Sequence, residues 1–333
     1  MIDRRSLLKA GAGAALAAPF VLRGRTAAAT TRWKAYTYLP SATKHGAKGL
    51  QDMFDRLKAE TDGELDIRLN IGGSLPIKGS NITQAAGEGI IDIAADGFFA
   101  GAVPVAGILR LPMLIQTETE FEAAYQAVKP LVDKGFERQG VLTLGHYLYP
   151  KQVFFGRGPI TSLADVQGLK VRVTSPEQGV FVERCGGVPL TIPTPDVATS
   201  LERGVVDAIM TASIGGGVFY RDLLASNYRL GVNYFESVII VNQRRFDRLS
   251  ADLQEKLKAA AFDAGRAITR VQFEEEPAVT ADLAKGGMTV TEAVPEDATK
   301  ASSLIAGYWG EWAASRGPDA EKALAAVRDV VGR

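Results

Sequence analysis

Cysteine and histidine are scarce in this chain, which narrows the kinds of site that it can form. Cys185 is the only cysteine among the 333 residues, so no disulfide can form within the chain and the fold must rest on its core. We expect Cys185, which lies beside two glycines in a helical pattern, to be a small buried apolar residue. The two histidines, His45 and His146, stand in no metal-ligand spacing, so a histidine-rich metal site is not expected.

Motifs of catalysis and of nucleotide binding are also missing. The sequence holds no Gly-x-Ser-x-Gly, no phosphate-binding loop and no Cys-x-x-Cys. The glycine run at residues 215–217 has no Lys-Ser or Lys-Thr after it and predicts a turn or a helix start. We therefore expect no enzyme activity and no cofactor. An exported hydrolase or oxidoreductase is the less favoured alternative, because it would need a nucleophile and a base, or a cofactor motif.

The apolar run near the N-terminus is too short for a membrane span. It covers about thirteen residues, 10–22, whereas a spanning helix needs roughly 20. Arg4 and Arg5 precede this run, and alanines at residues 27–29 follow it. Basic, apolar and small residues in this order predict that residues 1–29 are a twin-arginine-type signal peptide and that the mature protein lies in the periplasm. A membrane anchor is the alternative, which the length of the run disfavours.

Positive charge is not in excess either. Removal of residues 1–29 lowers the number of basic residues from 38 to 33 and the number of acidic residues from 38 to 37, so the mature chain is mildly acidic. Nucleic acids and anionic membranes both bind basic surfaces. We therefore expect no nucleic-acid partner and no membrane insertion after the signal is removed.

Strands and helices alternate along most of the chain. Hydrophobic periodicity first predicts a strand at 33–38, a helix at about 48–60, a strand at 65–71, a helix at 81–88 and a buried strand at 89–95. It then predicts a helix at 117–138, strands at 141–149, 153–155 and 168–173, a helix at 176–185, a strand at 189–192, a helix at 196–202, and strands at 204–210 and 238–241. This alternation is typical of an α/β fold with a parallel sheet and crossover helices.

Two short motifs suggest that the α/β pattern occurs twice. Residues 89–92 (Gly-Ile-Ile-Asp) and 204–207 (Gly-Val-Val-Asp) each follow a helix and open a buried strand, which fits two lobes of similar plan. The remaining chain predicts a long helix at 249–283, a short strand at 288–290 and terminal helices at 296–315 and 319–331. We expect Pro277 to kink or end the long helix, which is well suited to bracing two lobes.

The functional prediction depends on a basic strand at residues 168–173 (Gly-Leu-Lys-Val-Arg-Val). Val171 and Val173 alternate with Arg172, so we expect a half-buried strand that fixes one guanidinium in place. A guanidinium stays charged and can hold a carboxylate through two parallel hydrogen bonds. The alternative roles of Arg172 are a structural salt bridge or a solvated charge at a sheet edge.

A series of motifs in fixed order carries a resemblance to a known family. They are Phe54-x-x-Leu57 with Thr61-x-Gly63, the Gly-Ile-Ile-Asp motif, residues 162–173, residues 186–189 (Gly-Gly-Val-Pro), residues 201–207, and Asn242 with Phe246-x-x-Leu249. On these motifs the mature chain resembles, over essentially its whole length, the solute-binding proteins of tripartite ATP-independent periplasmic (TRAP) transporters, the dicarboxylate and sialic-acid receptor-like family.

The resemblance implies a two-lobed periplasmic binding protein. Each lobe would be a mixed sheet flanked by helices, and hinge strands and a long helix would join the lobes. On this basis we assign residues 30–151 and about 238–277 to lobe I, and residues 152–237 and about 278–333 to lobe II. The implied partners are a small organic acid and the membrane permease subunits of a TRAP transporter.

The resemblance also implies roles for particular residues. In the family, the arginine that corresponds to Arg172 pairs with the ligand carboxylate. A second polar group of the family, often asparagine, corresponds to Thr211, with Ser213 nearby. A hydroxyl cannot reproduce the hydrogen bonds of an amide, which has a donor and an acceptor on separate atoms. Where the family often has another arginine, this chain has Lys151 and Gln152.

Residues near predicted strand ends complete the expected site, because ligands of open α/β sheets sit beyond the carboxyl ends of the strands. The expected wall residues are Tyr36, Phe98, Tyr149, Asn233 and Tyr234, beside Tyr38, Phe99, Tyr147 and Phe235. Core packing or hinge filling is the alternative for each of them. The aromatics favour a carboxylate with an apolar or aromatic body. We therefore predict a receptor that delivers an organic acid to a TRAP permease, with an amino acid or a sugar acid as the alternative solute.

Overall fold

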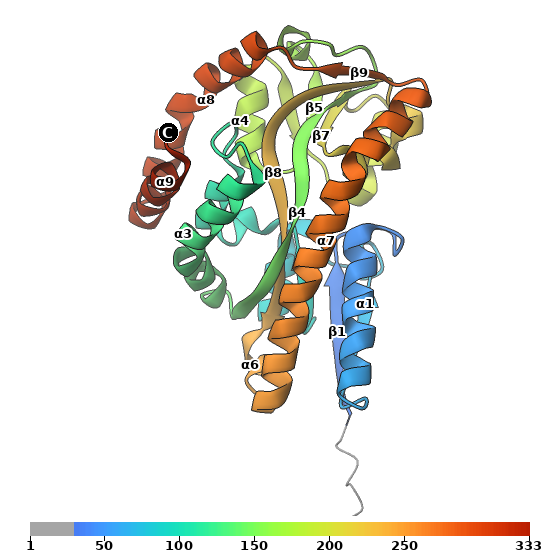
Figure 1. Ribbon diagram of the computed structural model, residues 1–333, viewed down its shortest axis with the longest axis vertical. Helices are drawn as coiled ribbons and strands as arrows, with labels where there is room; N and C mark the ends of the chain where they lie inside the picture. Colours follow the sequence, from blue (N-terminus) through green and yellow to red (C-terminus); the bar gives the residue numbers. More distant parts are fainter. Residues whose placement is uncertain (1–29) are drawn as a thin grey trace, which may run out of the picture.

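One mixed sheet of nine strands organises residues 30–333, the part of the chain that the computed structural model describes (Figure 1). The expected signal peptide, residues 1–29, lies outside the described residues. The strands are β1 (Thr31–Thr37), β2 (Leu65–Asn70), β3 (Ile93–Asp96), β4 (Val141–Gly156), β5 (Lys170–Val173), β6 (Val188–Thr191), β7 (Ala208–Thr211), β8 (Ser226–Asn242) and β9 (Thr289–Glu292). The helices are α1 (His45–Glu60), α2 (Ile82–Gly87), α3 (Glu118–Glu137), α4 (Pro176–Arg184), α5 (Val197–Glu202), α6 (Gln243–Phe246), α7 (Ala251–Lys285), α8 (Pro295–Arg316) and α9 (Pro318–Val331).

The sheet contains two parallel units of the same topology. Its strand order is β2-β1-β3-β8-β4-β7-β5-β6, and β9 pairs with β8. β1 runs parallel to β2 and β3, and β5 runs parallel to β6 and β7. We call the unit around β1 lobe I and the unit around β5 lobe II. The predicted α/β fold with two lobes of similar plan is confirmed.

The two glycine-aspartate motifs form equivalent turns in the two lobes. Gly89 (φ 79°) and Gly204 (φ 67°) adopt the left-handed conformation that glycine reaches without steric strain. Asp92 then accepts a hydrogen bond from a backbone N–H of β1 at 2.7 Å, and Asp207 accepts one from a backbone N–H of β5 at 2.9 Å. Each aspartate therefore ties the turn to the neighbouring first strand of its own lobe.

The antiparallel pair β4 and β8 runs through both lobes and is longer than the sequence predicts. Pairing extends from Val141 opposite Asn242 to Gly156 opposite Ser226, with shifts of register around Gln152. The expected strands at 141–149 and 153–155 are parts of one strand, and the expected strand at 238–241 is the end of another. Pro150 breaks the apolar pattern of β4, and residues 226–237 mix polar and apolar side chains, so local periodicity does not reveal their full length.

α7 packs against elements of both lobes, as its predicted length suggests. It contacts α1 in lobe I, β4, and the short π-helical turn Ser213–Gly217 in lobe II. Pro277 lies inside α7, which continues to Lys285, so of the two expected effects, a kink or an end, the end of the helix is wrong. The preceding residue, Glu276, accepts hydrogen bonds from the backbone N–H groups of Ser213 at 3.0 Å and Ile214 at 2.8 Å. These tertiary contacts hold the helix in place across the proline.

The C-terminal helices and Cys185 complete the packing. α8 packs against α4, whereas α9 packs against α3 and the 3-10 helix Pro104–Arg110, within residues that we assigned to lobe I. Cys185 is partly buried, and burial raises the pKa of its thiol to about 12. Among residues 30–333, no helix combines the length and apolar character that a membrane span requires.

Close contact between α7 and β4 generates a test of the fold. A Cβ atom at Gly265 would lie 2.1 Å from the carbonyl oxygen of His146, so we expect Gly265→Ala to lower the free energy of unfolding by about 1–3 kcal/mol or more. Gly310→Ala in α8 is the control, because a Cβ there meets nothing within 4 Å, and this variant should gain up to about 1 kcal/mol. Denaturant unfolding measures both effects, and an unchanged midpoint for Gly265→Ala would contradict this packing.

Candidate functional site

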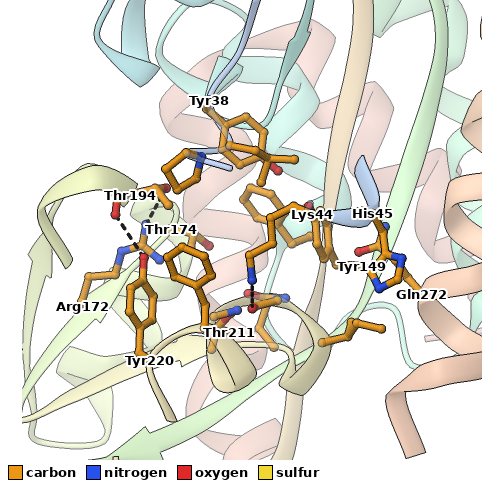
Figure 2. A pocket seen from close by; sticks show the side chains of 18 of the residues that line it. Tyr38, Lys44, His45, Tyr149, Arg172, Thr174, Thr194, Thr211, Tyr220 and Gln272 are labelled. Atoms are coloured by element: carbon orange, nitrogen blue, oxygen red, sulfur yellow. Dashed lines mark hydrogen bonds between the residues drawn. The ribbon is translucent and has the colours of Figure 1, made fainter. Parts of the chain in front are cut away.

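A cavity opens between the lobes, beyond the carboxyl ends of β1, β3, β5 and β7 (Figure 2). It encloses about 670 Å³ of empty space, part of it continuous with solvent. The lining residues are Tyr38, Leu39, Pro40, Lys44, His45, Phe98, Tyr149, Gln152, Arg172, Thr174, Thr194, Thr211, Ile214, Gly215, Gly216, Phe219, Tyr220, Phe235 and Gln272. Both lobes and α7 therefore contribute to one site.

Arg172 in β5 places a buried guanidinium at the cavity wall. Val171, Arg172 and Val173 are all buried, not half-buried as expected, and β6 and β7 pair with the two edges of β5. Arg172 Nε donates to the carbonyl oxygen of Ile192 at 3.1 Å, and Nη2 lies 3.4 Å from Thr194 Oγ1. Within residues 30–333, Nη1 has no hydrogen-bond partner. The side chain is thus fixed while part of its donor set stays available.

The charge of Arg172 is not neutralised by the part of the chain that the structure describes, where no carboxylate lies within 4.0 Å of it. Burial lowers the pKa of this guanidinium, and Tyr220 and Tyr38 partly oppose that effect. An arginine nevertheless remains charged in a protein. A buried, unpaired charge is costly, so the site favours an anion that would compensate it.

A second positive charge, that of Lys44, faces the same cavity. Burial lowers the pKa of Lys44 to about 8, so its ammonium is mostly charged at neutral pH. His45 also lines the cavity, and its Nε2 lies 3.2 Å from a carboxylate oxygen of Glu275. No aspartate or glutamate occurs among the lining residues. The cavity is therefore suited to anions.

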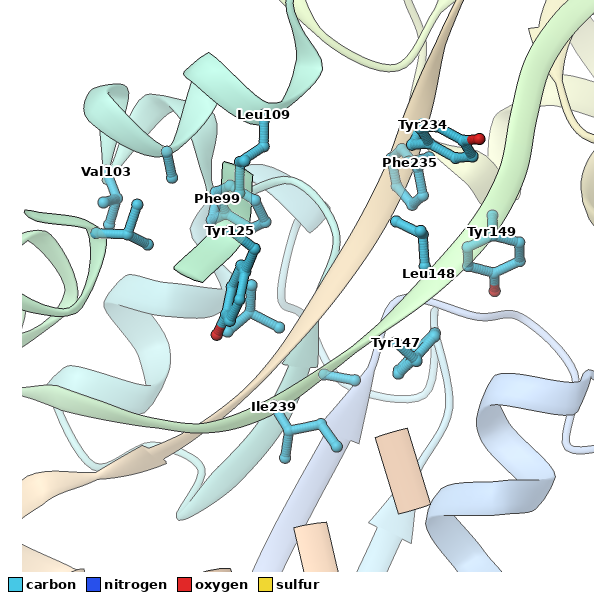
Figure 3. Packing of buried hydrophobic residues seen from close by; sticks show 14 of the residues in the cluster. Phe99, Val103, Leu109, Tyr125, Tyr147, Leu148, Tyr149, Tyr234, Phe235 and Ile239 are labelled. Carbon is cyan, nitrogen blue, oxygen red and sulfur yellow. The ribbon is translucent and has the colours of Figure 1, made fainter. Parts of the chain in front are cut away.

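Aromatic rings form the apolar wall. Phe235 in β8 lies edge-on to Tyr149 in β4, with ring centres 5.7 Å apart, and both appear in the packed cluster of Figure 3. Tyr38 and Phe98 extend the wall from lobe I, with ring centres 5.2 Å apart. The Tyr38 hydroxyl lies 2.8 Å from Ser237 Oγ, which orients its ring. This wall can contact the apolar body of a ligand.

The turn Ser213–Gly217 forms the floor of the cavity in lobe II. Thr211 Oγ1 accepts a hydrogen bond from the backbone N–H of Gly216 at 2.8 Å, so its hydroxyl proton can still be donated elsewhere. A Cβ at Gly216 would lie 2.8 Å from that same oxygen, which explains the need for glycine. The glycine run at residues 215–217 is thus a turn, as predicted.

Of the nine residues predicted to bind the ligand, five line the cavity: Arg172, Thr211, Gln152, Phe98 and Tyr149. Of the aromatic residues expected beside them, Tyr38 and Phe235 line it, whereas Phe99 and Tyr147 do not. Gln152 is buried, and its Nε2 donates to the carbonyl oxygen of Pro150 at 3.2 Å, which leaves its Oε1 without a partner among the described residues. The structure brings these five residues together from β4, β5, β7 and the segment that follows β3. Their roles in binding remain predictions.

Four other predicted residues lie outside the lining. Ser213 Oγ hydrogen-bonds with Arg229 and Thr280, away from the cavity. Tyr36 donates its hydroxyl proton to the Ile77 carbonyl oxygen at 3.1 Å. Placement at a strand end did not distinguish Tyr36 from lining residues, because the direction of a side chain depends on the pleat.

Asn233 and Tyr234 also lie outside the lining. Asn233 Oδ1 accepts from Gln178 Nε2 at 2.9 Å, and Gln178 in turn accepts from the Thr174 hydroxyl at 2.7 Å. Asn233 therefore supports a lining residue from behind. The Tyr234 ring stacks near Phe273, with ring centres 6.2 Å apart.

Several lining residues have no clear signal in the sequence. They are Lys44, Thr174, Thr194, Phe219, Tyr220 and Gln272. Tyr220, for example, donates to the Thr194 carbonyl oxygen at 3.1 Å and so stabilises the loop that holds Arg172. Only the position of Thr174, directly after the Arg172 strand, could have indicated it. No group of three or more metal-binding side chains occurs within residues 30–333.

A buried polar network lies behind the aromatic wall. Arg110 donates from Nη1 to the carbonyl oxygen of Gly97 at 2.8 Å and from Nη2 to the carbonyl oxygen of Glu236 at 2.7 Å. Its guanidinium also lies 4.6 Å from the centre of the Phe235 ring. The Glu236 carboxyl is buried, and neither of its oxygens has a hydrogen bond within the described residues. Burial raises the pKa of Glu236 to about 7, although Arg110 opposes the shift.

Comparisons with known proteins agree with this architecture. Residues 36–315 match the profile of the bacterial extracellular solute-binding protein, family 7. The 2,3-diketo-L-gulonate-binding periplasmic protein YiaO of Escherichia coli is 24% identical over 245 residues, which cover 71% of this chain and 74% of that protein. The ectoine/5-hydroxyectoine-binding periplasmic protein UehA of Ruegeria pomeroyi is 24% identical over 293 residues, which cover 85% of this chain and 83% of that protein.

Solved structures share the fold. DctP6, a Bordetella pertussis extracytoplasmic solute receptor binding pyroglutamic acid, superposes with a TM-score of 0.84 at 25% identity, covering 90% of this chain and 100% of that one. A TRAP solute-binding protein from a marine metagenome, described as specific for pyroglutamate, gives a TM-score of 0.83 at 25% identity, covering 90% of this chain and 99% of that one.

Glu236 yields a prediction about stability and pH. Its pKa is raised from 4.5 to about 7, so between these values the folded state binds more protons than the unfolded state and stability falls as pH rises. Glu236→Gln removes this dependence. The difference in free energy of unfolding, variant minus wild type, should therefore be higher at about pH 8 than at about pH 4, by up to roughly 3 kcal/mol. Unfolding of both proteins at the two pH values measures the difference, and a difference that does not change with pH would contradict the assignment.

Proposed function

This chain belongs to family 7 of the bacterial extracellular solute-binding proteins, and from that premise we propose that its ligand is a small carboxylate anion held by Arg172. The chain is a TRAP-type solute receptor for an organic acid. The observation that carries the proposed role of Arg172 is its buried guanidinium, which has no carboxylate partner among the described residues and borders the cavity between the lobes. A ligand carboxylate would compensate this charge through the donors that the protein leaves free.

The proposed ligand carries no ammonium group. An amino acid carries a cation beside its carboxylate, and buried cations need an anionic or strongly polar partner. The cavity lining offers two cations, Arg172 and Lys44, and no carboxylate. This charge pattern supports an organic acid over the amino-acid alternative. The pyroglutamate named for two structural relatives fits the same rule, because its nitrogen belongs to an uncharged amide.

The aromatic wall supports a ligand with an apolar body. Tyr38, Phe98, Tyr149 and Phe235 present ring faces and edges to the cavity, so part of the ligand surface would leave water on binding. A hydroxyl-rich sugar acid would gain less from this wall. We therefore place an acid with a short aliphatic or ring-shaped body ahead of a sugar acid.

Binding would be coupled to a movement of the lobes. Strands β4 and β8 join them, and the ladder between these strands shifts register around Gln152, where fewer regular hydrogen bonds resist bending. A ligand that contacts both lobes binds the closed form more strongly and shifts the population toward it. We propose that the closed receptor, in the periplasm, delivers its ligand to the membrane subunits of a TRAP permease. Relatives in this family are receptors and not enzymes, and delivery without chemical change is the corresponding role here.

The ligand class can be tested by thermal unfolding of residues 30–333 with millimolar carboxylates. Ligand at about 1,000 times its Kd stabilises by about 4 kcal/mol, so a fitting acid should raise the midpoint by several degrees. Each acid is paired with its 2-amino derivative, which should give no shift because the cavity has no anion for an ammonium. Shifts with the amino acids but not with the acids would contradict the proposal.

Arg172 can be tested with the acid that gives the largest shift. Arg172→Met should weaken binding by about 30-fold or more, because the ligand carboxylate loses its partner. Arg172→Lys should also weaken it, since lysine keeps the charge but not the planar pair of donors. Arg203→Met, an exposed substitution in lobe II that changes the charge equally, is the control. Isothermal titration calorimetry measures the constants, and near-normal affinity in Arg172→Met would remove Arg172 from the site.

A further inference from the structure

Lys44 reaches across the cavity from one lobe to the other. It lies in the loop between β1 and α1, which belongs to lobe I. Its Nζ donates to the carbonyl oxygen of Gly215 at 3.3 Å and lies 3.9 Å from the centre of the Phe219 ring, and both of these residues belong to lobe II. Figure 2 shows its chain extending through the middle of the cavity, with Arg172 and Tyr220 on one side and Gln272 on the other.

The contacts of Lys44 use only part of the hydrogen-bonding capacity of its ammonium. An ammonium has three donors, and in the described residues only Gly215 accepts one of them. No carboxylate within residues 30–333 lies within ion-pair distance of it, and burial is the cause of its lowered pKa. The nearby His45 has Glu275 as its own partner. Lys44 is therefore a partly buried cation with free donors that face a cavity.

The other lysine near the hinge, Lys151, does not combine free donors with a place in the cavity wall. Lys151 follows Pro150 in β4, close to the cavity in sequence, but its Nζ donates to Gln116 Oε1 at 2.9 Å and lies 6.0 Å from the centre of the Tyr234 ring. It does not line the cavity. Lys44 is thus the lysine among the described residues that can meet a ligand bound to Arg172.

We propose that Lys44 determines specificity by binding a second oxygen acceptor of the ligand, so that the preferred solute is a carboxylate with a further carboxylate or carbonyl oxygen at its far end. This proposal rests on the proposed function, because it assumes that the first carboxylate binds Arg172. The ammonium exchanges the neutral Gly215 carbonyl for the ligand oxygen, or shares its donors between the two. A charge-assisted hydrogen bond to a ligand is stronger than one between neutral groups. A ligand held by Arg172 in lobe II and Lys44 from lobe I also ties the closed form together.

The test compares acids of equal length that differ only at the far end. Pentanoate, 4-oxopentanoate and glutarate form one such set, and hexanoate, 5-oxohexanoate and adipate form a second. Isothermal titration calorimetry gives Kd for each acid with wild type, Lys44→Met and Lys48→Met. Lys48 is the matched control, because it lies in the same segment, is exposed, and pairs with Asp52 outside the cavity.

We expect wild type and Lys48→Met to bind a two-acceptor acid about tenfold or more tightly than the simple acid of its set. In Lys44→Met this preference should fall to about threefold or less, while the affinity for the simple acid changes little. If wild type prefers both the oxo acid and the dicarboxylate over the simple acid, any oxygen acceptor is sufficient for the contact with Lys44. If it prefers only the dicarboxylate, the contact requires a second negative charge. Both results support the proposal.

Two results would overturn it. If Lys44→Met keeps the preference for two-acceptor acids, another group binds the far end of the ligand. If the variant weakens all acids of a set equally, Lys44 only holds the lobes together. Either result leaves the proposed function intact as long as Arg172→Met still weakens binding by about 30-fold or more. Loss of the Arg172 effect, by contrast, contradicts the proposed function itself.

Discussion

The buried guanidinium of Arg172 is the constraint on which the rest of the site depends. Removing a charge from water is costly, and the protein repays only part of that cost with the carbonyl oxygen of Ile192 and the hydroxyl of Thr194. Tyr220 fixes the Thr194 loop, and the flanking strands β6 and β7 fix β5 itself. The fold thus holds a charge in a fixed position without a carboxylate partner among residues 30–333, and in the proposed function the ligand carboxylate supplies that partner.

The two lobes share a plan but contribute different chemistry to the cavity. Lobe II supplies the guanidinium and the glycine-rich turn, whose backbone N–H groups at Ser213 and Ile214 are anchored to Glu276 of α7. Lobe I supplies the rings of Tyr38 and Phe98 and the ammonium of Lys44. α7 contacts both lobes, so the helix that braces the molecule also positions the floor of the site. The same helix therefore contacts both lobes and fixes the floor of the cavity.

Local periodicity predicted the order of strands and helices, the equivalence of the two glycine-aspartate turns, and the strand that carries Arg172. These features follow from short-range rules of pleat, helix and turn. The full length of β8 and the inclusion of Lys44 and Tyr220 in the site could not be predicted in this way. They depend on which residues distant in sequence lie opposite one another, as Asn233 does behind Thr174 through Gln178. Position near a strand end correctly predicted that Phe98 and Tyr149 line the cavity. The same criterion also selected Tyr36, which does not line it.

The single cysteine makes this chain convenient for following lobe movement by fluorescence. Thiolate is the form that reacts with labelling reagents, and the raised pKa of partly buried Cys185 leaves almost none of it at neutral pH. A second cysteine introduced at the exposed lip of the cavity, for instance in place of Ala42, which is exposed between the lining residues Pro40 and Lys44, would therefore react first. A dye attached there would lie where the two lobes meet and would report occupancy of the cavity without prior removal of the native thiol.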